Sequence, residues 1–496
     1  ISKTFKEKFA LDAHIGASIK DNRFDELSVY GPIAGAPNIF NVVNLDKSQK
    51  KTPKTGWHEQ TQSFFYSLEL GWKSQLFVTT TGRNDWASQL ANSPQKSFFY
   101  PSVGVSWLPS STFNFPEKFN YLKIRASWAS VANPFPRELT IATHPYDDTI
   151  SGWDDKSNYP IGQLYPERTK TWELGFDARF LNGFTLTASW YRADTYNQTF
   201  NPNLSASSGY SDIYIQTGHV RNTGVEASLG YNHQWKNWNW NSQFTFSWNK
   251  NKIIELCKEW YNPITEETIS MNRLQISKLG RAKFILKEGG SMGDLYSTTD
   301  LRRDDKGNIE IDEGGNVVVE DNLPDMKLGS VFPDYNLAWR NSVSWKNLNL
   351  GFLVTARIGG IVNSLTQANM DLFGVSEATA AARDAGGALV NGRSLVNPET
   401  WYTAIASQGG IPQYYTYSAT NVRLQELSLG YTIPRKWLHN VCSITVSFVG
   451  RNLWMMYCKA PFDPEAVAST NNFYQGMDYF MMPSTRNLGF NINIKF

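Results

Sequence analysis

Apolar and polar residues alternate with a period of two along much of the chain. Residues 488–496 show the pattern clearly, because Leu488, Phe490, Ile492, Ile494 and Phe496 alternate with Gly489, Asn491, Asn493 and Lys495. Successive side chains of a strand point to opposite faces, so this segment predicts a strand with one apolar and one polar face. Strands of outer-membrane β-barrels have this pattern, and an aromatic terminal residue suits a closing strand. We therefore interpret Phe490, Ile492, Ile494 and Phe496 as a barrel-assembly signal.

The same pattern recurs along the whole chain, and the connections between strands are alternately short and long. We predict about fourteen strands, near residues 9–19, 64–72, 75–81, 97–107, 121–130, 171–180, 184–192, 220–231, 238–250, 337–345, 348–357, 422–431, 443–452 and 488–496. The long polar segments between the predicted hairpins are 21–60, 131–168, 194–218, 251–333, 358–421 and 453–485.

This regular alternation predicts the fold class. Outer-membrane barrels have short periplasmic turns and long extracellular loops, whereas a soluble sandwich has no reason to place every long loop at one end. The strand at 238–250 fits, since Trp238, Trp240, Phe244, Phe246 and Trp248 alternate with polar residues. We predict an all-β protein, a transmembrane antiparallel β-barrel with a polar lumen.

Composition agrees with a barrel. Aromatic residues make up 14% of the 496 residues and include 18 Trp, the residue type that gathers at membrane interfaces. No run of about 18 apolar residues predicts a transmembrane helix. The net charge of +2, without a basic cluster, argues against nucleic acid as a partner. Residues 1–5 lack signal-peptide features, so we expect a mature chain or a piece of a longer one.

Motifs that could carry chemistry have weak support. Gly289-Gly290-Ser291-Met292-Gly293 matches G-x-S-x-G, but a nucleophile elbow requires a strand-to-helix turn in a parallel α/β sheet. The segments 304–308 and 313–316 lack the spacing of a calcium loop and are better explained as hairpin turns. The 6 His show no metal-ligand spacing. We therefore expect no enzymatic activity, no catalytic residues, no metal and no cofactor.

The 3 cysteines lie far apart in the predicted topology. Cys442 and Cys458 fall at opposite ends of one strand and cannot pair. Cys257 and Cys458 both fall in predicted external loops, so they either pair in the oxidising envelope or remain free thiols.

Aromatic side chains in the predicted external loops are the candidate substrate-binding residues, because loops on a rigid barrel are where ligand contacts gather. These candidates are Trp153, Tyr159, Tyr165, Trp260, Tyr261, Trp401, Tyr402, Tyr414, Tyr415 and Tyr417. The alternative is that they pack the loops together or contact a partner protein. Residues 378–385 predict a short helix within one of these loops.

Several segments resemble the SusC/RagA family of TonB-dependent outer-membrane transporters, and they occur in the expected order over nearly the whole chain. The segments are TGRNDW (81–86), SFFYPSVGVSW (97–107), LKIRASW (122–128), PERTKTWELGF (166–176), VRNTGVE (220–226), VRLQELSLGYTIP (422–434) and GRNL (450–453). One local departure is residues 289–293, where the family more often has Gly-x-Pro-x-Gly, which puts the conformation of that loop in doubt.

The resemblance implies a barrel of about 22 strands with an N-terminal plug, driven by the TonB complex and capped by a SusD/RagB-like surface lipoprotein. It also implies import of oligosaccharides or oligopeptides across the outer membrane. The plug, the TonB box and about eight strands have no counterpart here. We therefore expect residues 1–496 to be the C-terminal portion of such a barrel.

Two other interpretations remain open at this stage. The first is a self-contained, passive outer-membrane barrel of about fourteen strands, an even number that can close. The second is a soluble all-β protein that binds or cleaves carbohydrate, for which two facing carboxylates would be needed.

Overall fold

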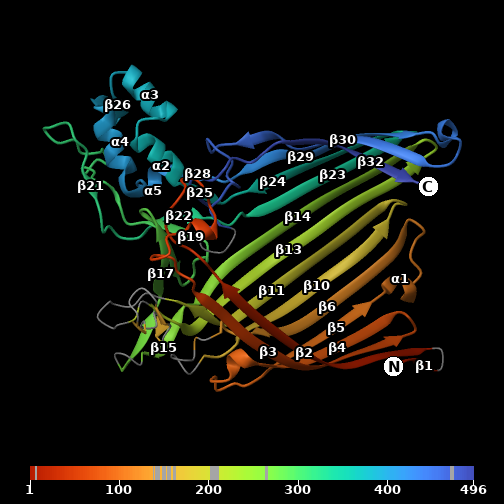
Figure 1. The fold of residues 1–496 in the computed structure, drawn as a ribbon. Helices are drawn as coiled ribbons and strands as arrows, with labels where there is room; N and C mark the ends of the chain where they lie inside the picture. Colours follow the sequence, from red (N-terminus) through yellow and green to blue (C-terminus); the bar gives the residue numbers. More distant parts are fainter. Residues whose placement is uncertain are drawn as a thin grey trace.

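One antiparallel sheet of 15 strands forms a curved wall in the computed structural model (Figure 1). The structure describes residues 1–5, 8–137, 139, 146–147, 152–153, 158–159, 164–201, 210, 212–262, 266–469 and 474–496. The order of strands in the wall follows their order in the sequence. They are β1 (Ser2–Phe5), β2 (Phe9–Leu27), β3 (Lys54–Trp72), β4 (Leu76–Ala87), β5 (Phe98–Trp107), β6 (Phe119–Asn133), β10 (Glu167–Phe180), β11 (Phe184–Phe200), β13 (Ile215–Trp235), β14 (Trp238–Glu255), β23 (Tyr335–Trp345), β24 (Leu348–Ile358), β29 (Asn421–Ile433), β30 (Ser443–Cys458) and β32 (Asn487–Lys495).

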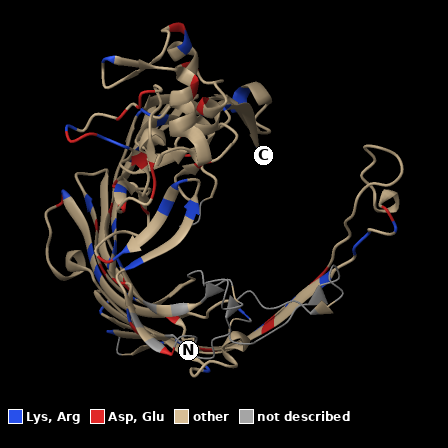
Figure 2. Cartoon of the chain, turned by 90° about the vertical axis from the view of Figure 1, so that its left-hand side faces the viewer, with Lys and Arg blue, Asp and Glu red and all other residues tan. Residues whose placement is uncertain are grey.

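The wall is an open arc rather than a closed barrel (Figure 2). Among the described residues, β1 pairs with β2 alone and β32 with β30 alone, so each end of the sheet has an unpaired edge. Apart from the four-residue β1, the wall contains the fourteen strands expected from the sequence. The predicted antiparallel wall is confirmed. These strands alone do not close it into a barrel.

Short turns lie at one end of the wall and long loops at the other, as predicted. Both chain ends lie at the end with the short turns (Figure 1). The turn from β3 to β4 has Lys73 and Ser74 at φ 49° and 55°. Two consecutive left-handed residues at the start of the three-residue connection 73–75 match the twist of the flanking strands, which explains the tight reversal there.

The first predicted loop is shorter than the sequence suggested. We expected residues 21–60 to form a loop, but β2 continues to Leu27 and β3 begins at Lys54, with Leu27 opposite Lys54. Backbone pairing does not require apolar side chains, so strands continue beyond the apolar band into the aqueous region. The alternating pattern marks only the part of a strand that has an apolar face.

The two faces of the wall differ in polarity. Ile15 and Phe490 are each 80% exposed, and large apolar side chains recur at alternate positions along the strands. Phe490, Ile492 and Ile494 lie opposite Phe448, Val446 and Ile444, which continues the apolar face onto β32. Their role as an assembly signal, together with that of Phe496, stays a prediction. The other face carries hydroxyl, amide and charged side chains.

The hydrophobic cores lie in the loop layer and at the loop end of the wall. A four-stranded sheet, β17 (Arg273–Leu279), β18 (Ala282–Lys287), β19 (Asp294–Ser297) and β22 (Met326–Ser330), packs beside β25 (Ile361–Ser364), β28 (Thr416–Ser418) and β31 (Met477–Asp478). The helices of this layer are α2 (Leu365–Leu372), α3 (Glu377–Asp384), α4 (Pro398–Ala406) and α5 (Pro412–Tyr415), and α3 confirms the helix predicted near 378–385.

Short elements complete the description. In the loops they are β7 (Tyr146–Asp147), β8 (Gly152–Trp153), β9 (Asn158–Tyr159), β12 (Asp212–Ile213), β15 (Cys257–Asn262), β16 (Glu267–Met271), β20 (Asp300–Leu301), β21 (Val319–Glu320), β26 (Ala388–Val390) and β27 (Ser394–Val396), and near the turns α1 (Pro109–Thr112). Among the described helices, none is long and apolar enough to cross a membrane.

The structure also bears on the weak motifs. Residues 289–293 lie in the connection between the antiparallel strands β18 and β19, and the Ser291 hydroxyl donates to Asn251 Oδ1 at 3.1 Å. Asp304 accepts the backbone N–H of Lys306 and of Asn308, and Asp312 accepts that of Asn316, as expected for hairpin turns. Cys442 and Cys458 have free thiols, and Cys257 is buried.

Candidate functional site

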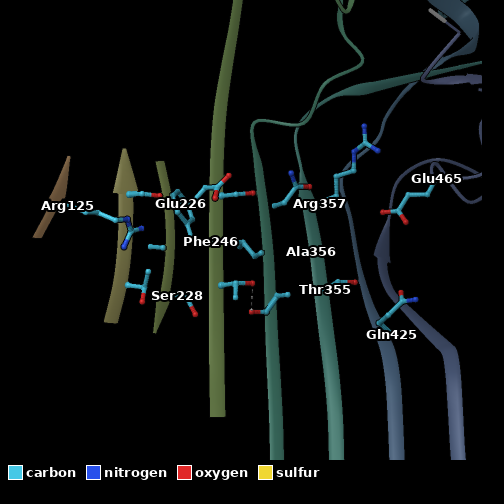
Figure 3. A pocket seen from close by; sticks show the side chains of 17 residues that line it. Arg125, Glu226, Ser228, Phe246, Thr355, Ala356, Arg357, Gln425 and Glu465 are labelled. Carbon is cyan, nitrogen blue, oxygen red and sulfur yellow. Dashed lines mark hydrogen bonds between the residues drawn. The ribbon is translucent and has the colours of Figure 1, made fainter. Parts of the chain in front are cut away.

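The polar face of the wall contains a hollow of about 690 Å³. Figure 3 shows Arg125 at one side, Glu226 between Arg125 and Phe246, and Arg357, Gln425 and Glu465 at the other side. Ser189, Ser228, Ser247 and Thr355 add hydroxyl groups to its lining. The lining strands run from β6 to β29, so the hollow spans about half the wall.

Arg125 is held flat against the wall by two carboxylates of the neighbouring strand β10. Its Nη1 lies 2.8 Å from Asp177 Oδ2, and its Nε lies 3.6 Å from Glu173 Oε1. Between these two positions is Gly175, which pairs with Arg125 in the register. A Cβ on residue 175 would lie 2.8 Å from the guanidinium carbon of Arg125. Glycine at this position therefore makes room for the arginine side chain to cross β10.

The other side of the hollow is organised by a buried arginine. Arg423 of β29 is 5% exposed, and its Nη2 lies 2.9 Å from Asp463 Oδ1 and 3.3 Å from Glu465 Oε2. Burial raises the pKa of Asp463, but hydrogen bonds from Arg423 and Ser484 outweigh burial and leave that pKa below its usual range. Asp463 is therefore a carboxylate at neutral pH. Glu465, two residues further along the same loop, lines the hollow.

Arg357 provides the second positive group at this side. Its Nη2 donates to the backbone oxygen of Val331 at 2.8 Å. Its Nε is buried and lacks a hydrogen-bond partner among the described residues. Charged groups of both signs and several hydroxyls therefore line one hollow, which suits a polar oligomer with donors and acceptors along its length.

Within the described ranges, no group of three or more His, Cys, Asp or Glu side chains is placed to hold a metal ion. The hollow offers hydrogen bonds and charge, which are means of binding and positioning.

Five of the ten predicted loop aromatics lie in the packed loop layer around α2 to α5. Tyr415 is 2% exposed, and its hydroxyl donates to Asp371 Oδ2 at 3.0 Å. Trp401 and Tyr414 make an edge-to-face contact with ring centroids 5.9 Å apart, and Tyr417 meets Phe462 in the same way at 5.7 Å. Burial raises the pKa of Tyr417 to about 12, so its hydroxyl stays protonated. Packing accounts for these four positions, and ligand contact by them stays a prediction.

Tyr402 differs from its neighbours because it lines a second hollow, of about 420 Å³, in the loop layer. Asp371, Phe373, Arg383 and Glu399 also line this hollow. The Tyr402 hydroxyl donates to the backbone oxygen of Ala378 at 3.1 Å, which fixes the ring between α3 and α4. An aromatic ring beside charged groups offers a flat apolar surface and polar contacts within one hollow.

The remaining candidates are separate from this group. Tyr165 and Tyr261 are exposed, whereas Trp260 packs against a buried cluster that includes Cys257 and Leu274. The backbones of Trp153 and Tyr159 belong to β8 and β9, but their side chains lie outside the described residues.

Sequence reasoning did not single out the residues of the first hollow. The available signal was charge at alternate positions of predicted strands, as at Arg125, Glu173, Asp177 and Glu226. Such charges mark the polar face, but their position along the strand does not say which of them gather into one hollow.

The fold and the hollow define the wall of an outer-membrane β-barrel with an apolar outer face and a polar lumen. The family model described as TonB dependent receptor-like, beta-barrel, matches residues 2–453. The chain therefore belongs to this family, whose members are outer-membrane transport proteins rather than enzymes. Membership excludes the soluble carbohydrate-active alternative.

Relatives and solved structures agree with this membership. TonB-dependent receptor P3 of Formosa agariphila is 26% identical over 99% of this chain and 51% of its own length. TonB-dependent receptor SusC of Bacteroides thetaiotaomicron is 22% identical over 76% of this chain and 38% of its own length. The RagAB peptide importer in its open-open state matches 100% of this chain and 53% of its own, with 19% identity and a TM-score of 0.78. This chain spans about half the length of P3 and of a further relative, TonB-dependent receptor P26 of Formosa agariphila.

Proposed function

We propose that this chain is the C-terminal portion of the barrel of a TonB-dependent importer that takes up oligosaccharides or oligopeptides. In this proposal, the plug and the first barrel strands belong to another part of the protein, and that part couples transport to the TonB complex. The observation that carries the proposal is the hollow on the lumen face, where Arg125, Glu226, Arg357 and Glu465 offer charge of both signs. The likeness in fold to the RagAB peptide importer supports it.

The proposed partner is a SusD/RagB-like surface lipoprotein that covers the loops. Support comes from apolar side chains that project from the loop layer: Phe373, Val375, Leu389 and Leu395 are between 62% and 75% exposed. These residues come from the segments that join α2 to α3 and from β26 and β27. Exposed apolar side chains in such a group are characteristic of protein contact surfaces.

Substrate contact is proposed at two levels. Tyr402, with Arg383 and Glu399, would meet the substrate in the loop layer, and the lumen hollow would meet it further along the barrel. The exposed Tyr165 and Tyr261 are further contact candidates.

The test is uptake of labelled oligosaccharides and labelled oligopeptides by cells that carry the whole protein. The variants Arg125→Ala and Glu226→Gln should reduce uptake of one substrate class, because each removes a charged group from the hollow. Arg179→Ala is the matched control. Arg179 lies on the polar face of the wall, on β10, where it stacks on Tyr121 and does not line the hollow. Equal uptake by all variants, at equal protein levels, would count against the hollow as the substrate path.

Energy dependence separates this proposal from the passive-barrel alternative. An importer driven by TonB should lose uptake when the cells lack TonB, whereas a passive barrel should keep it. Uptake that persists without TonB would favour a passive channel.

A further inference from the structure

The lipid-facing side of four neighbouring strands carries basic residues at the end of the wall that bears the long loops. We call Lys170, Arg192, Arg221, Lys250 and Lys252 the basic strip. In the register, Lys170 lies opposite Asp194, Asp194 opposite Arg221, and Arg221 opposite Lys252. Two residues further along each strand, toward the middle of the wall, the next row on the same face consists of Trp172, Arg192, Thr223 and Lys250. The strip therefore crosses β10, β11, β13 and β14.

Its position relative to the membrane follows from the aromatic residues beside it. The next row toward the middle of the wall is Leu174, Trp190, Val225 and Trp248, which is entirely apolar. Trp side chains on the outer face of a barrel mark the membrane interface. Each row of a tilted strand rises by about 5 Å, so the basic strip lies at the level of the lipid headgroups. The long loops are extracellular in such barrels, so these headgroups are those of the outer leaflet.

Asp194 holds two arginines of the strip side by side. Its carboxylate lies 2.9 Å from Arg192 Nε and 2.7 Å from Arg221 Nε, and the Asp194 side chain is only 9% exposed. His219 Nε2 lies 2.8 Å from the same carboxylate. Both arginines are bound through Nε, and among the described residues neither guanidinium makes another ion pair or hydrogen bond. Their terminal amino groups remain available to a second anion.

The two arginines of the strip share the carboxylate of Asp194, whereas its lysines have no such acidic partner among the described residues. Lys170 Nζ lies 5.2 Å from the centre of the Tyr196 ring, which in turn stacks on His219 at 4.4 Å. Among the described residues, no carboxylate lies within ion-pair distance of Lys170, Lys250 or Lys252. The acidic Glu255 lies opposite His219, farther from the middle of the wall. The strip therefore keeps a clear excess of positive charge.

The outer face of β2 and β3 at the same end of the wall provides a contrast. There Asp21 pairs with His58 at 2.9 Å and Arg23 pairs with Asp25 at 2.8 Å. Acidic and basic groups alternate in that region and satisfy one another. The unpaired positive charge is thus a property of the β10 to β14 strip and not of every strand end.

We propose that the basic strip binds the phosphate groups of lipopolysaccharide in the outer leaflet of the outer membrane. The phosphates would lie against the amino groups of Arg192 and Arg221, with Lys170, Lys250 and Lys252 around them. Arginine pairs bind phosphate through several charge-assisted hydrogen bonds, and each basic residue near an anionic lipid surface adds attraction. The acyl chains would follow the apolar rows below the tryptophans. This surface lies on the lipid side of the wall and is independent of the lumen hollow.

The test uses the whole protein purified from the outer membrane in detergent. Retention of bisphosphorylated lipid A and of its dephosphorylated form is measured by native mass spectrometry, for the wild type and for the triple variant Lys170→Gln, Arg221→Gln, Lys252→Gln. We expect the wild type to retain the phosphorylated form preferentially. Each neutralised charge should weaken retention about five-fold, so the triple variant should lose about a hundred-fold. Arg23→Gln is the matched control and should behave as the wild type.

Two results would overturn the proposal. One is equal retention of the phosphorylated and dephosphorylated lipids by the wild type, a comparison that does not depend on any variant folding. The other is unchanged retention by a triple variant whose heat-modifiable mobility shows an intact barrel. Substrate uptake is measured separately, so failure of the lipid site and failure of the importer proposal can be told apart.

Discussion

Gly175 shows how one residue on the polar face fixes the geometry of the lumen hollow. The arginine that crosses it, Arg125, needs the space that a side chain at residue 175 would fill. Its two acidic partners lie on either side, at Glu173 and Asp177. The absence of a side chain at Gly175 in β10 therefore allows the charged group of Arg125, on the neighbouring strand β6, to take its position.

We expect Gly175→Val to displace the guanidinium of Arg125, the flexible end of its side chain, from Glu173 and Asp177, and to destabilise the wall by up to about 1 kcal/mol through the lost ion pairs. Gly104→Val is the matched control, because Gly104 also lies on the polar face and its nearest neighbour would be 3.9 Å from an added Cβ. The measurement is the temperature at which heat-modifiable mobility is lost. Equal temperatures for the two variants would contradict this account of Gly175.

A carboxylate in the loop layer gives a prediction on pH. Asp325 lies 2.5 Å from Arg273 Nε and 3.0 Å from Lys287 Nζ. The hydrogen bond from Arg273, followed by the one from Lys287, holds the pKa of Asp325 well below its usual range despite partial burial. A depressed pKa in the folded state adds stability above the usual carboxyl pKa, and this stability is lost only as the pH falls through the folded pKa.

We therefore expect the protection of the β17 and β18 amides from hydrogen exchange to depend on ionised Asp325. After correction for intrinsic exchange rates, this protection should stay constant between pH 5 and 8. Asp325→Asn should reduce this protection throughout that range, by about 1.5–3 kcal/mol for the lost charged hydrogen bonds. Exposed Asp305 is the control, and Asp305→Asn should leave protection unchanged. A wild-type loss of protection near pH 5 would refute the assignment.

At the scale of elements, each strand of the wall places neighbouring residues in two different solvents. On β11, Ala188 lies on the apolar face between Phe176 and Ala227. Thr187, one residue away, lies on the polar face, where its hydroxyl donates to Asp177 Oδ1 at 2.9 Å. The face, and not the position along the chain, decides what each residue tolerates.

We expect Ala188→Arg to destabilise the membrane-inserted barrel by about 2–4 kcal/mol, the cost of an arginine near the bilayer midplane. Thr187→Arg should be tolerated, because the new guanidinium meets the carboxylate of Asp177 on the lumen side. Equilibrium unfolding from lipid vesicles measures both. Similar losses for the two variants would mean that the faces are wrongly assigned.

At the scale of the whole molecule, the separation of turns from loops defines which end faces the cell exterior. Lys236 lies in the short turn from β13 to β14, and Lys306 lies in an exposed turn of the loop layer. In a background without the native cysteines, a membrane-impermeant maleimide should label Lys306→Cys on intact cells. Lys236→Cys should be labelled only after the outer membrane is opened. The reverse pattern would invert the topology.

The unpaired edges at β1 and β32 lead to a second prediction at this scale. If residues 1–496 are the C-terminal portion of a barrel of about 22 strands, other strands must complete the wall. The polypeptide that carries this sequence in the outer membrane should then have a mass well above 56.2 kDa. Denatured intact mass spectrometry measures this, and a mass of 56.2 kDa without a second polypeptide would favour a self-closed barrel.

The sequence by itself determined the wall. Alternation at residues such as Leu488 to Phe496 reports which side of each strand meets lipid, and this property depends only on the residue and its neighbours. The order of short and long connections likewise follows from spacing along the chain. These local signals were sufficient for the fold class, the number of long strands and the short helix α3.

Only the tertiary structure decided which distant residues meet. Arg125, Glu226, Arg357 and Glu465 are each more than a hundred residues from the next in sequence, and they line one hollow because the register aligns three strands and the loop after β30 brings Glu465 beside them. Tyr415 looked like an accessible loop aromatic but is buried against Asp371, because the long loops build their own hydrophobic cores. The strands β2 and β3 extend beyond their apolar segments because backbone pairing does not depend on side-chain polarity. A pattern of polarity records the solvent around each residue, whereas contacts across the wall and within the loops depend on how the whole chain is arranged.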